Sequence, residues 1–392
     1  MNDESGRFAQ RARQAISAGD FAGAEILLLQ CLQSGGNPVP NWLNVAAIRR
    51  QRGDIDGAFQ ALREVLTRDT RNFPALLMNA TLLEKQGQMQ LAAATYASAL
   101  ANAPENTLLD APTRQALDHG RDIVAQHTRE LDSFIRDYIS ASESACTTTE
   151  KRRIDTFIRT TLRTRPRYRQ EPVEYFYPGL PSIEFYDRAE FDWLPAFEGQ
   201  SDLIRGELEA VLREDDSQLT PYIRYDAHLP LDQWRELNHS PRWSAWHLYD
   251  HGLPIQQRWN RVPATVAALS ALPQARVPRR SPSALFSVLA PKTRIPAHHG
   301  VANFRLVVHL PLILPGACGF RVGGETREWR YGEAWVFDDT IEHEAWNDSD
   351  QVRVIFICDI WSPRLSPEER QAIAATIEAT DQFSGVVPSG SI

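Results

Sequence analysis

A 34-residue repeat occupies the first third of the chain and constrains the fold more than any other feature. Gly19, Gly53 and Gly87 lie 34 residues apart and begin three similar segments, GDFAGAEILLLQCL, GDIDGAFQALREVL and GQMQLAAATYASAL. An alanine follows each glycine five residues later. Because glycine permits a tight turn and alanine lets two helices approach closely, the pattern predicts stacked helix–turn–helix units.

The period resembles that of the tetratricopeptide repeat, whose helix pairs stack into a solenoid. Apolar residues at helical spacing continue through APTRQALDHGRDIVAQHTRELDSFIRDYI, which we expect to cap the solenoid. The predicted helical domain therefore spans residues 1–145. An accidental likeness among three amphipathic helix pairs is the alternative. Solenoids of this kind present a concave surface to peptide or protein segments, so we expect a polypeptide partner here.

The charge and the cysteine content exclude several classes of function. The 392 residues carry 50 acidic and 42 basic side chains, a net charge of −8, which argues against a nucleic-acid binder and against a basic membrane-surface module. The four cysteines, Cys31, Cys146, Cys318 and Cys358, are scattered without paired spacing, which is typical of a reducing compartment. With a polar N-terminus and no long apolar run, we expect a cytoplasmic protein without a membrane anchor.

The composition changes after residue 145. Residues 146–180 are first basic and then rich in proline, which predicts a linker. The basic run is either a solvated face or a site for phosphate or an acidic partner. From residue 284, short β-branched and aromatic runs are broken by proline and glycine, among them ALFSVLAP, NFRLVVHLPLIL, AWVFDD and VRVIFICDIW. These runs predict an all-β sandwich or barrel within a C-terminal domain of residues 181–392.

Two histidines in this β region could share a metal ion. His298 precedes one predicted strand and His343 lies at the edge of a later pair, so a small barrel could bring both to one cation. Non-haem Fe(II) oxygenases use two histidines and a carboxylate, yet the residue two positions after His298 is Gly300. On their own these histidines are a weak signal, because a buried histidine is more often a hydrogen-bonded core residue.

A buried cation strengthens the interpretation. Arg353 begins the apolar run VRVIFICDIW, and an arginine on a buried strand needs an anion. Ser287 on a preceding strand could donate to the same anion, and His309 supplies a further inward polar group. Together these residue types predict a site for a metal and a dicarboxylate. The alternative for Arg353 is a structural salt bridge with a nearby acid, for which the candidates are Asp338, Asp339 and Asp359.

Two long segments, SVLAPKTRIPAHHGVANFRLVVHLPL and WRYGEAWVFDDTIEHEAWNDSDQVRVIFICDIWSP, resemble the aspartyl/asparaginyl β-hydroxylase family of Fe(II)- and 2-oxoglutarate-dependent dioxygenases. The resemblance covers roughly residues 180–365 and includes YPGLPSIEFYDRAEF and WSAWHLYDHG. It implies a double-stranded β-helix, a jelly-roll or cupin-like fold, and hence an α+β chain of two domains. It also implies that His298 and His343 bind Fe(II) without a carboxylate, so that Gly300 is the family's normal state.

The same resemblance implies how the cosubstrates bind. Arg353 and Ser287 would hold the distal carboxylate of 2-oxoglutarate, His309 would help at its other end, and O₂ would complete the reaction. One position departs from the family, which often has an arginine two residues before this third histidine. Here that residue is Val307, and Arg305, on the same strand face but one pleat farther away, is the nearest base that could replace it.

The function implied by the resemblance is hydroxylation of the β-carbon of aspartyl or asparaginyl residues in a protein or peptide that the repeats deliver. Hydroxylation of a small molecule or a lipid acyl chain is an alternative, since some relatives act in that way. A second alternative is a non-catalytic repeat scaffold with an inactive barrel. The sequence leaves the substrate, the stereochemistry and the oligomeric state open.

Overall fold

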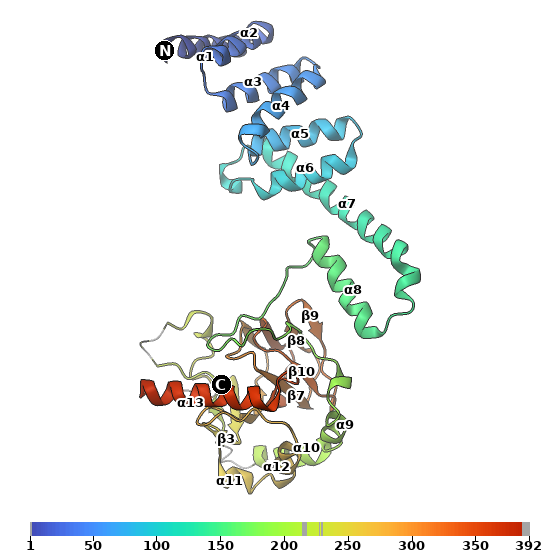
Figure 1. Cartoon of the computed structure of the whole chain (residues 1–392), viewed down its shortest axis with the longest axis vertical. Coiled ribbons are helices and arrows are strands. Elements are labelled where there is room, and N and C mark those ends of the chain that lie inside the picture. The colour runs from blue at the N-terminus through green and yellow to red at the C-terminus, as the bar shows by residue number, and fades with distance from the viewer. Residues whose placement is uncertain (1, 214–217, 227, 229, 386–392) are drawn as a thin grey trace. The chain divides into compact units, whose positions relative to one another are not determined.

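The computed structural model of the chain describes residues 2–213, 218–226, 228 and 230–385 (Figure 1). The chain divides into two compact units, Met1–Leu162 and Arg163–Ile392. The division falls within residues 146–180, the predicted linker, and this segment also contains a helix, α8 (Thr148–Thr161). One unit is helical and the other is built on antiparallel sheets, so the fold class is α+β as predicted.

The first unit consists of helix pairs followed by a long helix. Neighbouring helices pack as α1 with α2, α3 with α4, and α5 with α6, and α7 then packs against α6. The elements of this unit are α1 (Asn2–Ser17), α2 (Phe21–Gln33), α3 (Pro38–Gln51), α4 (Ile55–Arg68), α5 (Phe73–Lys85), α6 (Met89–Ala101), η1 (Asn106–Leu108), α7 (Ala111–Glu143) and α8.

The repeat glycines and alanines have the roles that the sequence predicts. Gly19, Gly53 and Gly87 lie in the turns within the pairs with φ between +72° and +80°, a region that other residues adopt at a cost. The alanine five residues after each glycine is fully buried. The aspartate after the first two glycines also caps the next helix, as Asp54 does by accepting from the Gly57 N–H. The helix–turn–helix repeat is therefore confirmed.

Close packing joins the last pair to α7. Gly120 of α7 lies against the buried ring of Tyr96, whose hydroxyl donates to Glu84 at 2.7 Å. A Cβ atom at position 120 would come within 2.6 Å of the Tyr96 ring. The absence of a side chain at Gly120 thus lets α7 approach α6.

This contact predicts the effect of Gly120→Ala. Alanine favours a helix over glycine by about 1 kcal/mol, but forcing a methyl group into a packed interface costs about 1–3 kcal/mol. We expect a net loss of stability of about 1 kcal/mol, measured by urea unfolding followed by circular dichroism. Gly6→Ala in α1, where a Cβ atom would meet nothing within 4 Å, is the control that should not destabilise. An unchanged midpoint for Gly120→Ala would contradict this account of the packing.

The second unit contains two antiparallel sheets. The larger has the strand order β1-β2-β5-β12-β7-β10, the smaller has the order β6-β11-β8-β9, and β3 pairs with β4 separately. The strands are β1 (Thr220–Pro221), β2 (Trp243–His247), β3 (Tyr249–Asp250), β4 (Leu253–Pro254), β5 (Ala284–Leu289), β6 (Thr293–His298), β7 (Arg305–Ile313), β8 (Cys318–Val322), β9 (Glu325–Arg327), β10 (Trp335–Phe337), β11 (His343–Asn347) and β12 (Arg353–Trp361). The sequence-predicted strands and the two-sheet architecture are confirmed.

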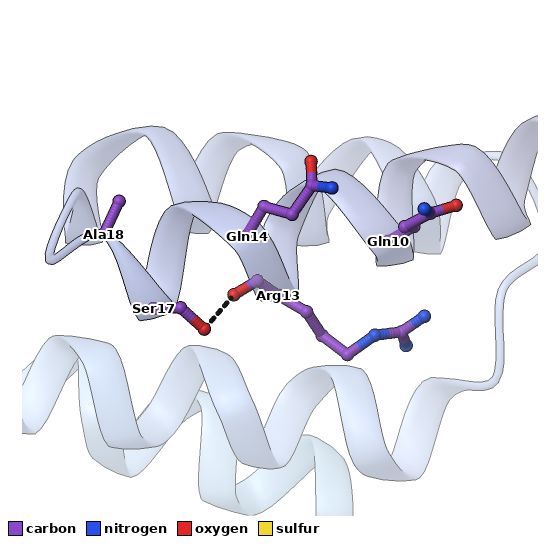
Figure 2. Close-up of a pocket in the computed structure, with 5 residues that line it drawn as sticks. All are labelled: Gln10, Arg13, Gln14, Ser17 and Ala18. Atoms are coloured by element: carbon purple, nitrogen blue, oxygen red, sulfur yellow. Dashed lines mark hydrogen bonds between the residues drawn. The ribbon is translucent and has the colours of Figure 1, made fainter.

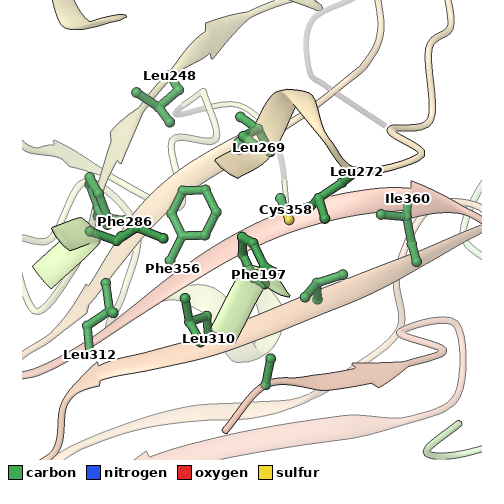
Figure 3. Close-up of a cluster of buried hydrophobic side chains, with 14 of the residues drawn as sticks. Phe197, Leu248, Leu269, Leu272, Phe286, Leu310, Leu312, Phe356, Cys358 and Ile360 are labelled. Carbon is green, nitrogen blue, oxygen red and sulfur yellow. The ribbon is translucent and has the colours of Figure 1, made fainter. Parts of the chain in front are cut away.

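The second unit also contains helices, and several of them pack against one face of the larger sheet. They are η2 (Arg188–Glu190), α9 (Leu194–Glu198), α10 (Ser201–Arg213), η3 (Asp232–Trp234), α11 (Gln256–Trp259), α12 (Pro263–Ser270) and α13 (Pro367–Ser384). Figure 3 shows the apolar cluster on this face, in which Phe356 of β12 and Leu310 of β7 lie near Phe197 of α9. Within the described residues, no helix combines the length and the apolarity that crossing a bilayer requires.

The opposite face of the larger sheet looks toward the smaller sheet. Alternate residues point to opposite faces of a strand, so Ile355 of β12 and Leu289 of β5 join Phe320 of β8 in a second apolar cluster. The polar side chains of β5, β7 and β12 that the sequence singles out share this inner register. The strand register therefore directs them into the space between the sheets.

Candidate metal and anion site

The two predicted metal ligands face each other across paired strands. His343 of β11 lies directly opposite His298 of β6 in the antiparallel register, and their ring centroids are 4.0 Å apart. A shift of register follows immediately after this pair, between His343 and Ala345. Strand pairing thus brings together two side chains that are far apart in the sequence.

Backbone carbonyls fix the orientation of both rings. Nδ1 of His298 lies 2.8 Å from the carbonyl oxygen of Pro296, and Nδ1 of His343 lies 3.1 Å from that of Ile341. Because a carbonyl can only accept, each Nδ1 carries the hydrogen, and each Nε2 is left with a lone pair. Burial lowers the pKa of both rings, and for His343 the neighbouring His298 adds to the effect. Neutral imidazoles held in this way suit a divalent metal ion.

A carboxylate occupies the space that a third ligand after His298 would need. A Cβ atom at Gly300 would come within 2.1 Å of an oxygen of Asp339, and the Gly300 N–H already donates to the Asp339 carbonyl at 2.6 Å. Any other residue at this position would have to displace the Asp339 carboxylate. Within the described residues, no three His, Cys, Asp or Glu side chains lie close enough together to hold a metal, so the histidine pair would be the whole protein contribution.

Asp339 also forms an ion pair with one of the predicted site residues. Arg305 Nη2 donates to Asp339 Oδ2 at 3.0 Å, and both side chains are largely buried. The second oxygen of Asp339 and the Nε of Arg305 are buried and make no hydrogen bond in the described part of the chain. Val307, two residues along β7, packs in the inner apolar cluster and brings no cation.

Arg353 is a buried cation that has no carboxylate partner among the residues the structure describes. It is 1% exposed, and its Nε and Nη2 atoms find no hydrogen-bond acceptor among the described residues. Its guanidinium carbon lies 4.9 Å from the centre of the Trp329 ring, and burial lowers its pKa to about 10. The ion pairs of the described residues include none between Arg353 and Asp338, Asp339 or Asp359. A buried unpaired charge is costly, so this geometry indicates a place for an anion.

Two further predicted residues lie on the same inner face. Ser287 of β5 accepts a hydrogen bond from Trp243 Nε1 at 3.2 Å, which leaves its own hydroxyl hydrogen to donate elsewhere. His309 of β7 packs against Phe337 with ring centroids 4.6 Å apart, and its Nδ1 is buried without a partner among the described residues. Burial, with a smaller contribution from the charge of Arg353, lowers the pKa of His309.

An aromatic wall, Tyr222, Trp234 and Trp243, stands beside the histidine pair and was not predicted from the sequence. The Trp234 ring meets the His298 ring edge-on at 5.1 Å, and Tyr222 stacks on Trp243 at 3.9 Å. Trp329 and Asp339 are further neighbours that the sequence did not mark as site residues. Two sequence features could have pointed to these residues. Trp243 lies two positions before Ala245 on a predicted strand, so the two share a face, and Asp339 belongs to the acidic pair that ends AWVFDD.

A hollow on the first unit lacks such chemistry. About 490 Å³ of space lies on α1 beside Gln10, Arg13, Gln14, Ser17 and Ala18, all of them exposed (Figure 2). Its hydrogen bond in Figure 2 runs from the Ser17 hydroxyl to the Arg13 carbonyl at 3.0 Å, within one helix. Its five lining residues include no histidine, cysteine, aspartate or glutamate, and its one charged residue, Arg13, is exposed.

The tight fit at Gly300 makes a testable prediction. Gly300→Ala should displace Asp339 and lower the free energy of unfolding by about 1–3 kcal/mol, the usual cost of overpacking a filled site. Chemical denaturation followed by tryptophan fluorescence measures this. Gly206→Ala in α10, where a Cβ atom meets nothing within 4 Å, should be neutral or stabilising. Equal stability of the Gly300→Ala and wild-type proteins would show that the carboxylate does not fill this space.

Comparison with known proteins finds sequence relatives of the second unit. The sequence profile of aspartyl/asparaginyl β-hydroxylases matches residues 198–363, which hold all the residues discussed above for the second unit's site. The mouse aspartyl/asparaginyl β-hydroxylase is 32% identical over 185 residues, 47% of this chain and 25% of that protein. The ornithine lipid ester-linked acyl 2-hydroxylase of Rhizobium tropici is 32% identical over 201 residues, 50% of this chain and 67% of that protein.

A third relative, human aspartate β-hydroxylase domain-containing protein 2, is 29% identical over 217 residues, 54% of this chain and 56% of that protein. The chain spans about a quarter of the length of the mouse enzyme. In each case the similarity covers about half of this chain.

Proposed function

The chain belongs to the aspartyl/asparaginyl β-hydroxylase family, and on that premise we propose that it is an Fe(II)- and 2-oxoglutarate-dependent dioxygenase. The observation that carries the proposal is the histidine pair, whose Nδ1 atoms face carbonyls and whose Nε2 atoms therefore keep their lone pairs, in the same unit as Arg353, a buried cation with no carboxylate partner among the described residues. Imidazole nitrogens suit iron, and a bidentate guanidinium suits a carboxylate. When bound, Fe(II) with O₂ and 2-oxoglutarate supplies the oxidant that hydroxylates an unactivated C–H bond.

The residues of the chain would divide the work as follows. His298 and His343 hold the metal through Nε2, while the carbonyls of Pro296 and Ile341 keep both rings in the required tautomer. Arg353 would bind the distal carboxylate of 2-oxoglutarate, which would supply the counterion that Arg353 lacks among the described residues. The Ser287 hydroxyl donates to the same carboxylate.

The remaining polar groups act near the other end of the cosubstrate. His309 is the buried polar group available there, and Arg305 stays bound to Asp339. The free oxygen of Asp339 is an acceptor beside the ligand pair, because its carboxylate fills the space next to Gly300. The aromatic wall shields His298 from water on one side.

The substrate we propose is an aspartyl or asparaginyl residue of a protein or peptide, hydroxylated at its β-carbon. The support is the family and the repeat unit, since helical solenoids of this kind bind polypeptides. A lipid acyl chain is a second candidate, and two observations favour it. The wall beside His298 is aromatic, and Arg305, the basic residue closest in sequence to Val307, is already paired with Asp339.

Measurements of Fe(II) affinity should distinguish the two proposed ligands from a neighbouring histidine. His298→Ala and His343→Ala should each weaken Fe(II) binding by at least about 100-fold, because each removes one of only two protein ligands. The matched control is His299→Ala, since His299 adjoins His298 and lies 3.9 Å from Glu171. Anaerobic equilibrium dialysis with Fe(II) measures the affinities. Retention of iron by either ligand variant, or loss of iron in the control, would contradict the assignment.

Arg353 should control cosubstrate affinity and leave metal affinity unchanged. Removing one partner of a buried charge pair costs about 2–5 kcal/mol, so Arg353→Ala should weaken 2-oxoglutarate binding by roughly 100-fold or more. Arg353→Lys should recover only part of the loss, because lysine lacks the planar fork. Calorimetric titration and conversion of 2-oxoglutarate to succinate give the readouts. A wild-type protein that binds no iron and forms no succinate would overturn the proposal and favour a repeat scaffold.

A further inference from the structure

The helix α7 carries an apolar seam that continues beyond its own partner. The seam positions are spaced alternately by three and four residues, which is the a/d pattern of a coiled coil: Leu117, Gly120, Val124, His127, Leu131, Phe134 and Tyr138. Gly120 and His127 are the two members of this row that carry no apolar side chain. The first part packs on α6, where Leu117 and Gly120 are buried and Val124 borders the apolar cluster. Figure 1 shows that α7 extends past the end of α6.

The second part of the seam is uncovered. Leu131 is 38% exposed, Phe134 is 66% exposed and Tyr138 is 82% exposed, and the rings of Phe134 and Tyr138 stack on each other with centroids 6.2 Å apart. Residues 121–143 of α7 extend for about 34 Å without one buried residue. Scattered exposed apolar residues are normal, but an ordered a/d row of them indicates a missing helical partner.

The following helix does not supply this partner. Ile158 is the one buried residue of α8, and none of the apolar clusters of the described residues includes a residue between 125 and 162. Arg136 of α7 donates to Asp155 of α8 at 2.7 Å, but the two side chains are more than a third exposed. An exposed ion pair contributes about 0–1 kcal/mol. Two helices joined in this way have almost no core of their own, and such hairpins are marginal in water.

The charges of the two helices are complementary. Residues 121–143 of α7 hold five carboxylates and three arginines, whereas α8 holds four basic and two acidic side chains. The net charges are therefore −2 and +2. The basic helix also exposes Phe157, which is 70% accessible to solvent. One hairpin thus presents an acidic helix with an open apolar seam and a basic helix with an open aromatic residue.

We propose that this hairpin, residues 121–161, pairs with the same hairpin of a second copy of the chain. In the pair, α7 of each copy lies against α8 of the other, which gives a four-helix arrangement around the two seams. A two-fold axis satisfies both contacts at once, because each hairpin carries both complementary halves. The result is a homodimer formed through the repeat unit, independent of the reaction at the histidine pair.

Loss of the seam should separate the dimer. Sedimentation of the full-length protein over a range of concentrations should give twice the 44.3 kDa chain mass for the wild type. The double variant Phe134→Glu/Tyr138→Glu should sediment as one chain. Leu91→Glu is the matched control, because Leu91 on α6 is 57% exposed and lies outside the hairpin. Circular dichroism must show that the repeat unit of each variant remains folded, since exposed positions tolerate charge.

Charge reversal identifies the pairing. Lys151→Glu/Arg153→Glu on α8 should weaken the dimer at least 10-fold, and Glu130→Lys/Asp137→Lys on α7 should do the same. Combining all four changes should restore the association. A wild-type protein that stays monomeric at every concentration, as it would if another part of the chain covered the seam, would overturn the proposal. So would a folded Phe134→Glu/Tyr138→Glu variant that remains dimeric, or four-residue reversal without recovery.

Discussion

The antiparallel pairing of β6 with β11 is the constraint on which the rest of the site depends. It sets His343 opposite His298 and leaves their rings 4.0 Å apart, although 45 positions separate them in the sequence. On its other edge β11 pairs with β8, which places Val322 beside His343 in the same sheet. A slip of one residue would turn every side chain of β11 to the other face, so the apolar pattern that fixes the register also fixes the positions of the two histidines of the candidate metal site.

Glycine at position 300 follows from the same geometry. The loop after β6 passes so close to the loop before β11 that the Gly300 N–H bonds to the Asp339 carbonyl, and the Asp339 carboxylate fills the space of a side chain. The carboxylate is thus near the histidine pair but belongs to another loop and is paired with Arg305. Within the part of the chain that the structure describes, buried polar atoms of Arg353, His309 and Asp339 have no hydrogen-bond partner, and leaving such atoms unpaired is costly.

Much of this arrangement could be predicted from the sequence, for identifiable reasons. The 34-residue period is visible in the sequence because each turn needs a glycine with positive φ. The β-strands are visible as short apolar runs between prolines and glycines. Arg353 was recognisable because a charged residue inside an apolar run requires a partner, whereas His298 and His343 were identified as metal ligands through the family resemblance. The distance between the His298 and His343 rings could not be predicted, because strand register depends on contacts between segments that are distant in the sequence.

The unpredicted contacts of Asp339 and Trp234 join segments that are distant in the sequence. Asp339 was considered only as a partner for Arg353, since nothing in the sequence shows that its carboxylate lies beside Gly300. Trp234 ends the short 3-10 helix η3, whose sequence shows no periodicity, so its contact with His298 could not be inferred. The helix α8 lies inside a stretch whose basic residues and later prolines predict a linker, and its capping box of Thr147 and Glu150 is the local signal that marks its start.

The most direct test of the central claim is the protonation state of the two ring nitrogens in the metal-free protein. Nitrogen-15 NMR of labelled histidines should show His298 and His343 neutral near pH 7 with hydrogen on Nδ1, because each Nδ1 donates to a carbonyl. One equivalent of Zn²⁺, a diamagnetic substitute, should then shift both Nε2 signals together. Hydrogen on Nε2 of either ring, or a metal-induced shift at only one of the two, would contradict a shared metal site.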